Sequence, residues 1–166
     1  MEKEFIRLIN QHPGILYKVC NLYLQEAEDK RDLFQEIVLQ LWKAFPNFRQ
    51  EAQPSTWMYR VALNTAISNF RKKSKGFFAT SLSEAELQIP DPQQFSLGDD
   101  NIGILHRAIA QLSPVEKAII LLYLEEKTYG EMAEVIGITK SNVGVSLSRI
   151  KTKLEKILKS LPYEFR

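Results

Sequence analysis

Apolar residues recur along most of this chain with the 3.6-residue period of an α-helix, and no long stretch alternates with the period of a β-strand. An apolar face opens at Phe5, breaks at Pro13 and resumes at Ile15. The clearest helix follows, and we expect Pro46 to end it. Its apolar residues form one stripe, which predicts a buried face: Leu33, Phe34, Ile37, Val38, Leu41, Trp42 and Phe45.

A third helix is predicted from about Thr56 to Lys73. The polar segment from Asn47 to Pro54 is expected to be a loop, and Ser55 is a candidate N-cap residue. Residues 76–103 then break the helical pattern with glycines and prolines. This segment is therefore predicted to be a linker between two helical parts.

The C-terminal part of the chain is helical again and carries strong helix-start signals. A short helix is expected from Ile104 to Leu112. Ser113 and Glu116 have the spacing of a capping box, as do Thr128 and Glu131. These signals predict two further helices with well-defined beginnings.

The segment from Tyr129 to Val143 has the pattern of a helix-turn-helix. Ala133 is small enough for two helices to cross closely, and Gly137 can adopt the positive φ of a tight turn. Thr139 can cap a last helix that runs to about Leu158. The expected shared core consists of Met132, Ile136, Ile138, Val143 and Leu147.

The last helix carries residues that suit a major groove. Residues 137–153 hold four basic side chains and no acidic one. A recognition helix needs short polar groups near its N-terminal end and cations for phosphates. An ordinary helical hairpin with a solvated basic face is the alternative. The candidate DNA contacts, which we call the recognition-helix set, are Lys140, Ser141, Asn142, Ser146, Arg149, Lys151 and Lys153.

The helix predicted before the linker is also basic, with five cations and no acid over residues 55–75. Aromatic residues interleave with these cations, a combination that suits unstacked bases and phosphates. Taken singly, Trp57 and Phe70 fit a hydrophobic core better than a DNA contact. The run from Arg71 to Lys73 favours phosphate contact. The candidate contacts, which we call the cationic-helix set, are Trp57, Arg60, Asn64, Arg71, Lys72 and Lys73.

Composition supports a globular protein, because 45% of the 166 residues are apolar and 25% are charged. The net charge of +2 is unevenly distributed. It is +3 over residues 1–73, −4 over residues 74–103 and +3 over residues 104–166. Two basic blocks around an acidic segment favour a nucleic-acid binder with an acidic connector.

Several classes of site and location are disfavoured. The single cysteine, Cys20, excludes an intrachain disulfide and a multi-cysteine zinc site, and its place on an apolar helix face predicts a core residue. Two histidines and the lack of a nucleotide-binding glycine motif give no basis for a catalytic site, a cofactor or a metal. No apolar run approaches the roughly 20 residues of a membrane span, and the N-terminus does not resemble a secretory signal. We therefore expect a cytoplasmic protein without membrane insertion.

Polar residues lie outside the apolar stripe of the helix that ends at Pro46. From spacing alone, a solvated face is the simplest interpretation of these residues. We call them the polar-face set: Asp32, Gln35, Glu36 and Gln40.

Three segments together resemble bacterial sigma factors of the extracytoplasmic-function (ECF) group of the sigma-70 family. The motif from Asp32 to Glu36, followed by an apolar run and Trp42, resembles the helix that binds core RNA polymerase. The segment from Thr56 to Ala66 resembles the helix that engages the −10 promoter element. The helix-turn-helix resembles the C-terminal domain that reads the −35 element.

The resemblance implies an all-α protein of two small helical domains joined by an acidic linker. Residues 1–75 would form a sigma-2-like domain, residues 76–103 the linker, and residues 104–166 a sigma-4-like domain. The linker would thread toward the RNA exit path of the polymerase. An anti-sigma factor is implied as a regulatory partner.

The resemblance also assigns roles to the three sets of residues. The polar-face set would bind core RNA polymerase. The cationic-helix set would hold the single-stranded −10 element, with a flipped base near the loop from Asn47 to Pro54. The recognition-helix set would contact the duplex −35 element. The family often has a dense arginine run in this helix, and the stretch from Gly144 to Lys151 has fewer cations.

Two other functions fit part of the sequence. A stand-alone dimeric helix-turn-helix regulator would bind a palindrome, but it has no need of the first 73 residues. An interaction module that binds a partner through Trp42 and Phe45 leaves both basic segments unexplained. A non-enzymatic sigma factor accounts for more of the chain than either.

Overall fold

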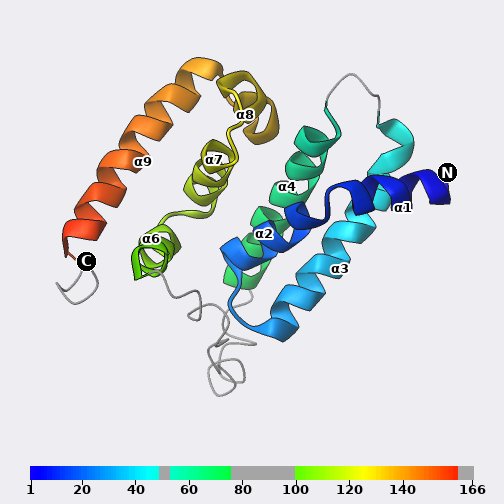
Figure 1. Ribbon diagram of the computed structural model, residues 1–166, viewed down its shortest axis with the longest axis horizontal. Helices are drawn as coiled ribbons and strands as arrows, with labels where there is room; N and C mark the ends of the chain where they lie inside the picture. Colours follow the sequence, from blue (N-terminus) through cyan, green and yellow to red (C-terminus); the bar gives the residue numbers. More distant parts are fainter. Residues whose placement is uncertain (49–52, 76–99, 161–166) are drawn as a thin grey trace. The chain divides into compact units, whose positions relative to one another are not determined.

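A computed structural model describes residues 1–48, 53–75 and 100–160 (Figure 1). Every regular element in these ranges is helical, which confirms the all-α prediction. The chain divides into two compact units, Met1–Ile89 and Pro90–Arg166, each considered by itself below. Among the described residues, no helix is long and apolar enough to cross a membrane.

The first unit is built on three helices that pack against one another, α2, α3 and α4. Helix α1 joins them through Phe5, whose ring lies 5.1 Å from that of Trp42. The core includes Leu16, Val19, Leu33, Ile37, Leu41, Met58 and Leu63, all at most 2% exposed. The elements are α1 (Glu2–Gln11), α2 (Pro13–Tyr23), α3 (Ala27–Ala44), the 3₁₀ turn η1 (Phe45–Asn47) and α4 (Pro54–Lys75).

Helix α4 begins two residues earlier than predicted, at Pro54 rather than Thr56. The Trp57 N–H donates to the Gln53 carbonyl at 3.1 Å, so the helical hydrogen bonds start from Gln53. Proline suits the first position of a helix because the N–H it lacks would have no partner there. The prediction of Ser55 as the N-cap residue was therefore wrong, since Ser55 lies inside the helix.

The stripe predicted on α3 is only partly buried. Leu33, Ile37 and Leu41 are at most 2% exposed, but Trp42 is 40% exposed. The residues beside the central row lie on its flank, where Trp42 contacts the ring of Phe5 edge-on. The stripe is thus correct in position and too wide, because α2 and α4 cover only its central row.

The second unit packs α6, α7 and α8 against the long last helix, α9 (Figure 1). Its core includes Ala108, Ile119, Leu122, Met132, Val143, Leu147 and Ile150, all at most 3% exposed. Helix α6 begins at Asp100. The prediction that residues 100–103 belong to the linker was therefore wrong, because these residues are helical. The rest of the predicted linker lies outside the described residues. The elements are α6 (Asp100–Ala110), α7 (Pro114–Leu124), α8 (Tyr129–Ile136) and α9 (Lys140–Ser160).

Both predicted capping boxes are confirmed. The Glu116 N–H donates to Ser113 Oγ at 3.2 Å, and the Ser113 N–H donates to Glu116 Oε1 at 2.9 Å. The Thr128 and Glu131 pair makes the same two bonds, each 3.1 Å long. These bonds satisfy backbone N–H groups that a helix start leaves unpaired, so they fix where α7 and α8 begin.

The turn of the helix-turn-helix is also as predicted. Gly137 ends α8 with φ +84°, a conformation that glycine adopts at little cost. The Asn142 N–H donates to Thr139 Oγ1 at 3.1 Å, which caps α9. The shared core is narrower than expected, because Ile136 and Ile138 on either side of the turn are only half-buried.

Candidate nucleic-acid interface

The buried residues of α9 determine which of its faces is free. Val143, Leu147, Ile150 and Leu154 point into the second unit, and each is at most 7% exposed. On the opposite face, Ser141, Val145, Ser148 and Thr152 follow one another at helical spacing and are exposed. All members of the recognition-helix set are exposed except Ser146, which is half-buried at the edge of this face.

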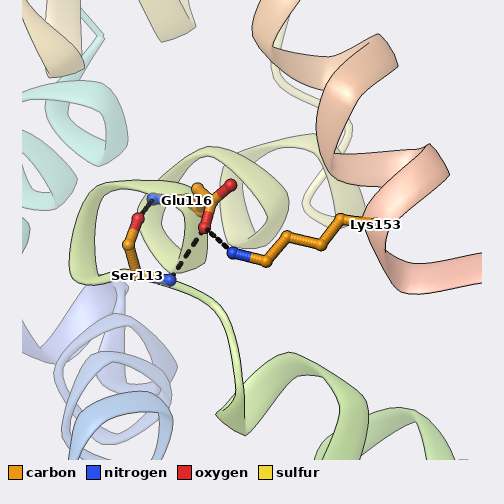
Figure 2. A network of polar contacts seen from close by, with 3 residues as sticks. All are labelled: Ser113, Glu116 and Lys153. Atoms are coloured by element: carbon orange, nitrogen blue, oxygen red, sulfur yellow. Dashed lines mark hydrogen bonds and ion pairs between the residues drawn. The ribbon is translucent and has the colours of Figure 1, made fainter. Parts of the chain in front are cut away.

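Two lysines of the recognition-helix set have partners on α7. Lys153 Nζ lies 2.9 Å from Glu116 Oε1, as Figure 2 shows. Lys151 Nζ donates to the Tyr123 hydroxyl at 3.2 Å and lies 4.4 Å from the centroid of that ring. Both lysines therefore help to hold α9 against α7, in addition to any contact they make with DNA.

Glu116 joins the start of α7 to α9 (Figure 2). Its carboxylate accepts from the Ser113 N–H and from Lys153, each at 2.9 Å. Burial by itself would raise the pKa of Glu116, but the hydrogen bonds from Ser113 and Lys153 outweigh it and lower the pKa. The capping box was visible in the sequence. The bond to Lys153, 37 positions away, left no sequence signal.

The N-terminal end of α9 lies against the N-terminal end of α8. A Cβ atom on Gly130 would lie 3.1 Å from Cε of Lys140, so the Lys140 stem crosses the first turn of α8. A Cβ atom on Gly144 would lie 3.6 Å from the ring of Tyr129. These contacts place the Lys140 side chain beside the start of α8.

In the first unit, the polar-face set lies on α3, with Asp32, Glu36 and Gln40 on the side toward α4. Asp32, Gln35 and Glu36 are exposed, and Gln40 is half-buried. Gln40 Nε2 donates to Glu36 Oε1 at 3.0 Å. The structure thus leaves these acceptor groups accessible to a large partner.

The cationic-helix set lies on α4. Arg60, Asn64, Arg71 and Lys72 are exposed, whereas the side chain of Lys73 lies outside the described ones. Phe70 is 41% exposed, so its assignment to the core was wrong. It follows Ala66, the last buried residue among the side chains of α4 that the structure describes, by one helical turn.

Trp57 is half-buried in an aromatic cluster at one end of the first unit. Its ring lies 4.5 Å from that of Phe48 and 6.4 Å from that of Phe45, measured between centroids. Phe45 in turn lies 5.4 Å from Phe5. The cluster fixes the chain just before residues 49–52, which are the part of the predicted loop outside the described residues.

An open groove of about 620 Å³ runs between α3 and α4. It brings together members of the polar-face set and of the cationic-helix set that the sequence assigned to separate surfaces. Acidic and basic groups face the same space, which suits a partner with polar groups of both kinds. The groove is lined by Asp32, Glu36, Gln40, Asn64, Thr65, Ser68, Asn69 and Lys72.

Within the described ranges, His, Cys, Asp and Glu form no group of three that could hold a metal ion. Cys20 is 1% exposed, which confirms its assignment to the core, and burial raises its thiol pKa to about 11. A buried thiol of this kind is a poor nucleophile.

The chain matches two known protein families. Residues 8–76 match the family described as Sigma-70 region 2, and residues 102–154 match the family described as Sigma-70, region 4. The RNA polymerase sigma-H factor of Pseudomonas aeruginosa is 25% identical over 150 residues, covering 84% of this chain and 78% of that protein. The ECF RNA polymerase sigma factor SigW of Bacillus subtilis is 24% identical over 170 residues, covering 95% and 90%.

Solved structures are similar in fold. The sigma factor RpoE of Bartonella quintana, in complex with the anti-sigma factor NepR, aligns with a TM-score of 0.70 at 16% identity. That alignment covers 97% of this chain and 98% of the other. CnrH, in complex with the cytosolic domain of CnrY, gives a TM-score of 0.70 at 17% identity, covering 98% and 92%.

Proposed function

This chain belongs to the sigma-70 family of RNA polymerase sigma factors, in its ECF group, and we propose that its two helical units divide promoter recognition between them. Residues 1–75 form the polymerase and −10 domain, residues 76–99 the linker, and residues 100–166, which begin with α6, the −35 domain. The family matches over residues 8–76 and 102–154 support this division. The stand-alone dimeric regulator is not favoured, because it leaves the first match unexplained.

The helix-turn-helix is the observation that carries the DNA-binding role. Both of its helices begin at side-chain caps, and its turn contains a left-handed glycine, Gly137. The exposed face of α9 then presents Ser141, Asn142 and Arg149. Side chains in the first turns of a recognition helix contact base edges, and cations beside them contact phosphates. We assign the recognition-helix set to the duplex −35 element.

The cationic-helix set is assigned to the melted −10 strand. Arg60 and Asn64 stand one helical turn apart on the exposed side of α4, and Asn64 also lines the groove. A separated strand exposes base edges that amides can hydrogen-bond and phosphates that arginines can pair. Holding the single strand stabilises the open complex, and this is how the chain promotes strand opening.

The polar-face set is assigned to core RNA polymerase. Its exposed carboxylates and amides suit a partner surface rich in arginine and backbone or side-chain donors. The polymerase supplies the chemistry of RNA synthesis, so this chain needs no catalytic residue, cofactor or metal of its own. Because polymerase and promoter DNA are cytoplasmic in bacteria, the chain acts there.

Binding to core polymerase tests this assignment. The double variant Asp32→Ala with Gln35→Ala removes an ionic and a neutral acceptor while leaving the core of α3 unchanged. We expect roughly 30-fold weaker binding in a quantitative pull-down, because hydrogen bonds to a charged group across an interface are strong. Asn21→Ala, at an exposed position of α2, is the matched control and should bind normally. Unchanged affinity of the double variant would count against this docking surface.

An anti-sigma factor is proposed as a further partner. Two of the solved structures that this chain resembles are complexes, one of the sigma factor RpoE with the anti-sigma factor NepR and one of CnrH with the cytosolic domain of CnrY. A similar complex of this chain would cover surfaces that otherwise meet polymerase or DNA.

A further inference from the structure

Val145 is an apolar side chain in the middle of the face that α9 turns away from its core. It is 47% exposed. Asn142 precedes it by three residues and Arg149 follows it by four, so all three share one side of the helix. Val145 therefore lies between an amide, a group that can hydrogen-bond to bases, and a cation, a group that can bind phosphates or guanine.

Folding does not explain why valine occupies this position. A β-branched residue is a weaker helix former than alanine, and the preceding Gly144 is weaker still. Neither residue belongs to the buried core of α9. Gly144 is half-buried on the side that faces Tyr129 of α8, whereas Val145 lies on the exposed side. The valine is therefore not explained by packing within the unit, which points to a contact with something outside it.

The charges around Val145 also favour recognition by a neutral side chain. In residues 140–150 the only cations are Lys140 and Arg149. Lys140 lies across Gly130 on α8, and the next lysines, Lys151 and Lys153, reach α7. Few cations are thus available for base contacts, and discrimination between base pairs falls largely to neutral groups on this face.

We propose that Val145 contacts the 5-methyl group of a thymine in the major groove of the −35 element and so selects a T·A pair at that position. The major groove exposes this methyl only at thymine, and an apolar side chain is the group that recognises it. This inference rests on the proposed function of the second unit.

Deoxyuridine substitution isolates the methyl group. The holoenzyme of full-length chain and core polymerase first selects a −35 sequence from a library of random duplexes. Each thymine of that sequence is then replaced singly by deoxyuridine, and binding is measured. For the unsubstituted chain, we expect one replacement to weaken binding about fourfold, the loss for one buried methyl group.

Variants of the chain tie that loss to one side chain. In Val145→Ser, the same duplex should bind equally well with thymine and with deoxyuridine. Val145→Thr keeps one methyl group and should retain part of the discrimination between thymine and deoxyuridine. This variant also tests the contact if Val145→Ser fails to fold, as shown by loss of its thermal unfolding transition. Val115→Ser, at a 36% exposed valine of α7, is the control and should discriminate like the unsubstituted chain.

The possible failures are distinguishable. Two results would overturn the thymine contact while the proposed function stands. In the first, a sequence is selected but no deoxyuridine replacement weakens binding. In the second, a replacement weakens the binding of Val145→Ser as much as that of the unsubstituted chain. If the holoenzyme selects no duplex sequence, the proposed function of the second unit is overturned, and this inference with it.

Discussion

Lys151 and Lys153 illustrate, at the scale of single residues, how structure modifies a role assigned from charge. Both lie in a basic stretch that suits phosphate contacts, yet each meets a side chain of α7, Tyr123 or Glu116. The side chain of Lys153 remains 46% exposed, so its positive charge still contributes to the potential near the DNA face. A basic residue of this helix can therefore have two roles, because it can hold the helix in position and also attract DNA.

Gly144 provides a prediction at the same scale. A Cβ atom there would meet the Tyr129 ring at 3.6 Å, an ordinary contact, so alanine fits without rearrangement. Because glycine is a poor helix former, we expect Gly144→Ala to raise the free energy of unfolding by about 1 kcal/mol. Chemical denaturation of the full chain measures this change.

Gly137→Ala is the matched control for that measurement. Gly137 has φ +84°, where a side chain is strained, so this variant should lose about 1 kcal/mol or more. If Gly144→Ala were as destabilising as Gly137→Ala, the packing of α9 against Tyr129 described above would be incorrect.

At the scale of elements, local chemistry made the second unit predictable. The starts of α7 and α8 follow from capping boxes, and the end of α8 follows from Gly137; all of these signals lie within a few residues. Helix α4 shows where such reasoning failed, because Pro54 and Ser55 both suit a helix start and only the bond to Gln53 decides between them. Which residues are buried was harder to predict. Trp42 and Phe70 are exposed, because burial depends on which elements pack beside a residue and no local sequence pattern reveals that.

The bond between Glu116 and Lys153 gives a prediction for the packing of α7 on α9. A double-mutant cycle with Glu116→Gln and Lys153→Met should yield a coupling energy of about 0.5 kcal/mol, the usual size for a partly exposed pair. Glutamine keeps an acceptor for the Ser113 N–H, so the cap of α7 is retained. A coupling energy of zero at neutral pH would show that the pair does not stabilise the unit.

The same coupling should depend on pH in a defined direction. The folded unit lowers the pKa of Glu116 below its ordinary value of 4.5. The unfolded chain therefore takes up a proton first as the pH falls, and the stabilisation is lost as the pH drops through the lowered pKa. Above the ordinary value the coupling should be constant, which unfolding measured across acidic buffers can check.

At the scale of the whole molecule, the sequence predicted two all-α parts. It did not predict which residues of different helices within one part lie side by side. Glu36 of the polar-face set and Asn64 of the cationic-helix set lie 28 residues apart in the chain, and each set was assigned its own surface. The packing of α3 against α4 places Glu36 and Asn64 in one groove. The surfaces proposed for polymerase docking and strand capture thus adjoin in the first unit, which would let one event influence the other.

Reconstituted transcription with the purified chain, core polymerase and a library of candidate upstream regions tests the central claim most directly. We predict transcripts that start at specific positions only when this chain is present, with shared −35 and −10 elements upstream. Arg149→Ala should lose binding to the duplex −35 element, whereas Asn64→Ala should bind it and leave the strands closed to permanganate. Failure to bind core polymerase, with retained binding to a duplex site, would contradict the account and favour a stand-alone regulator.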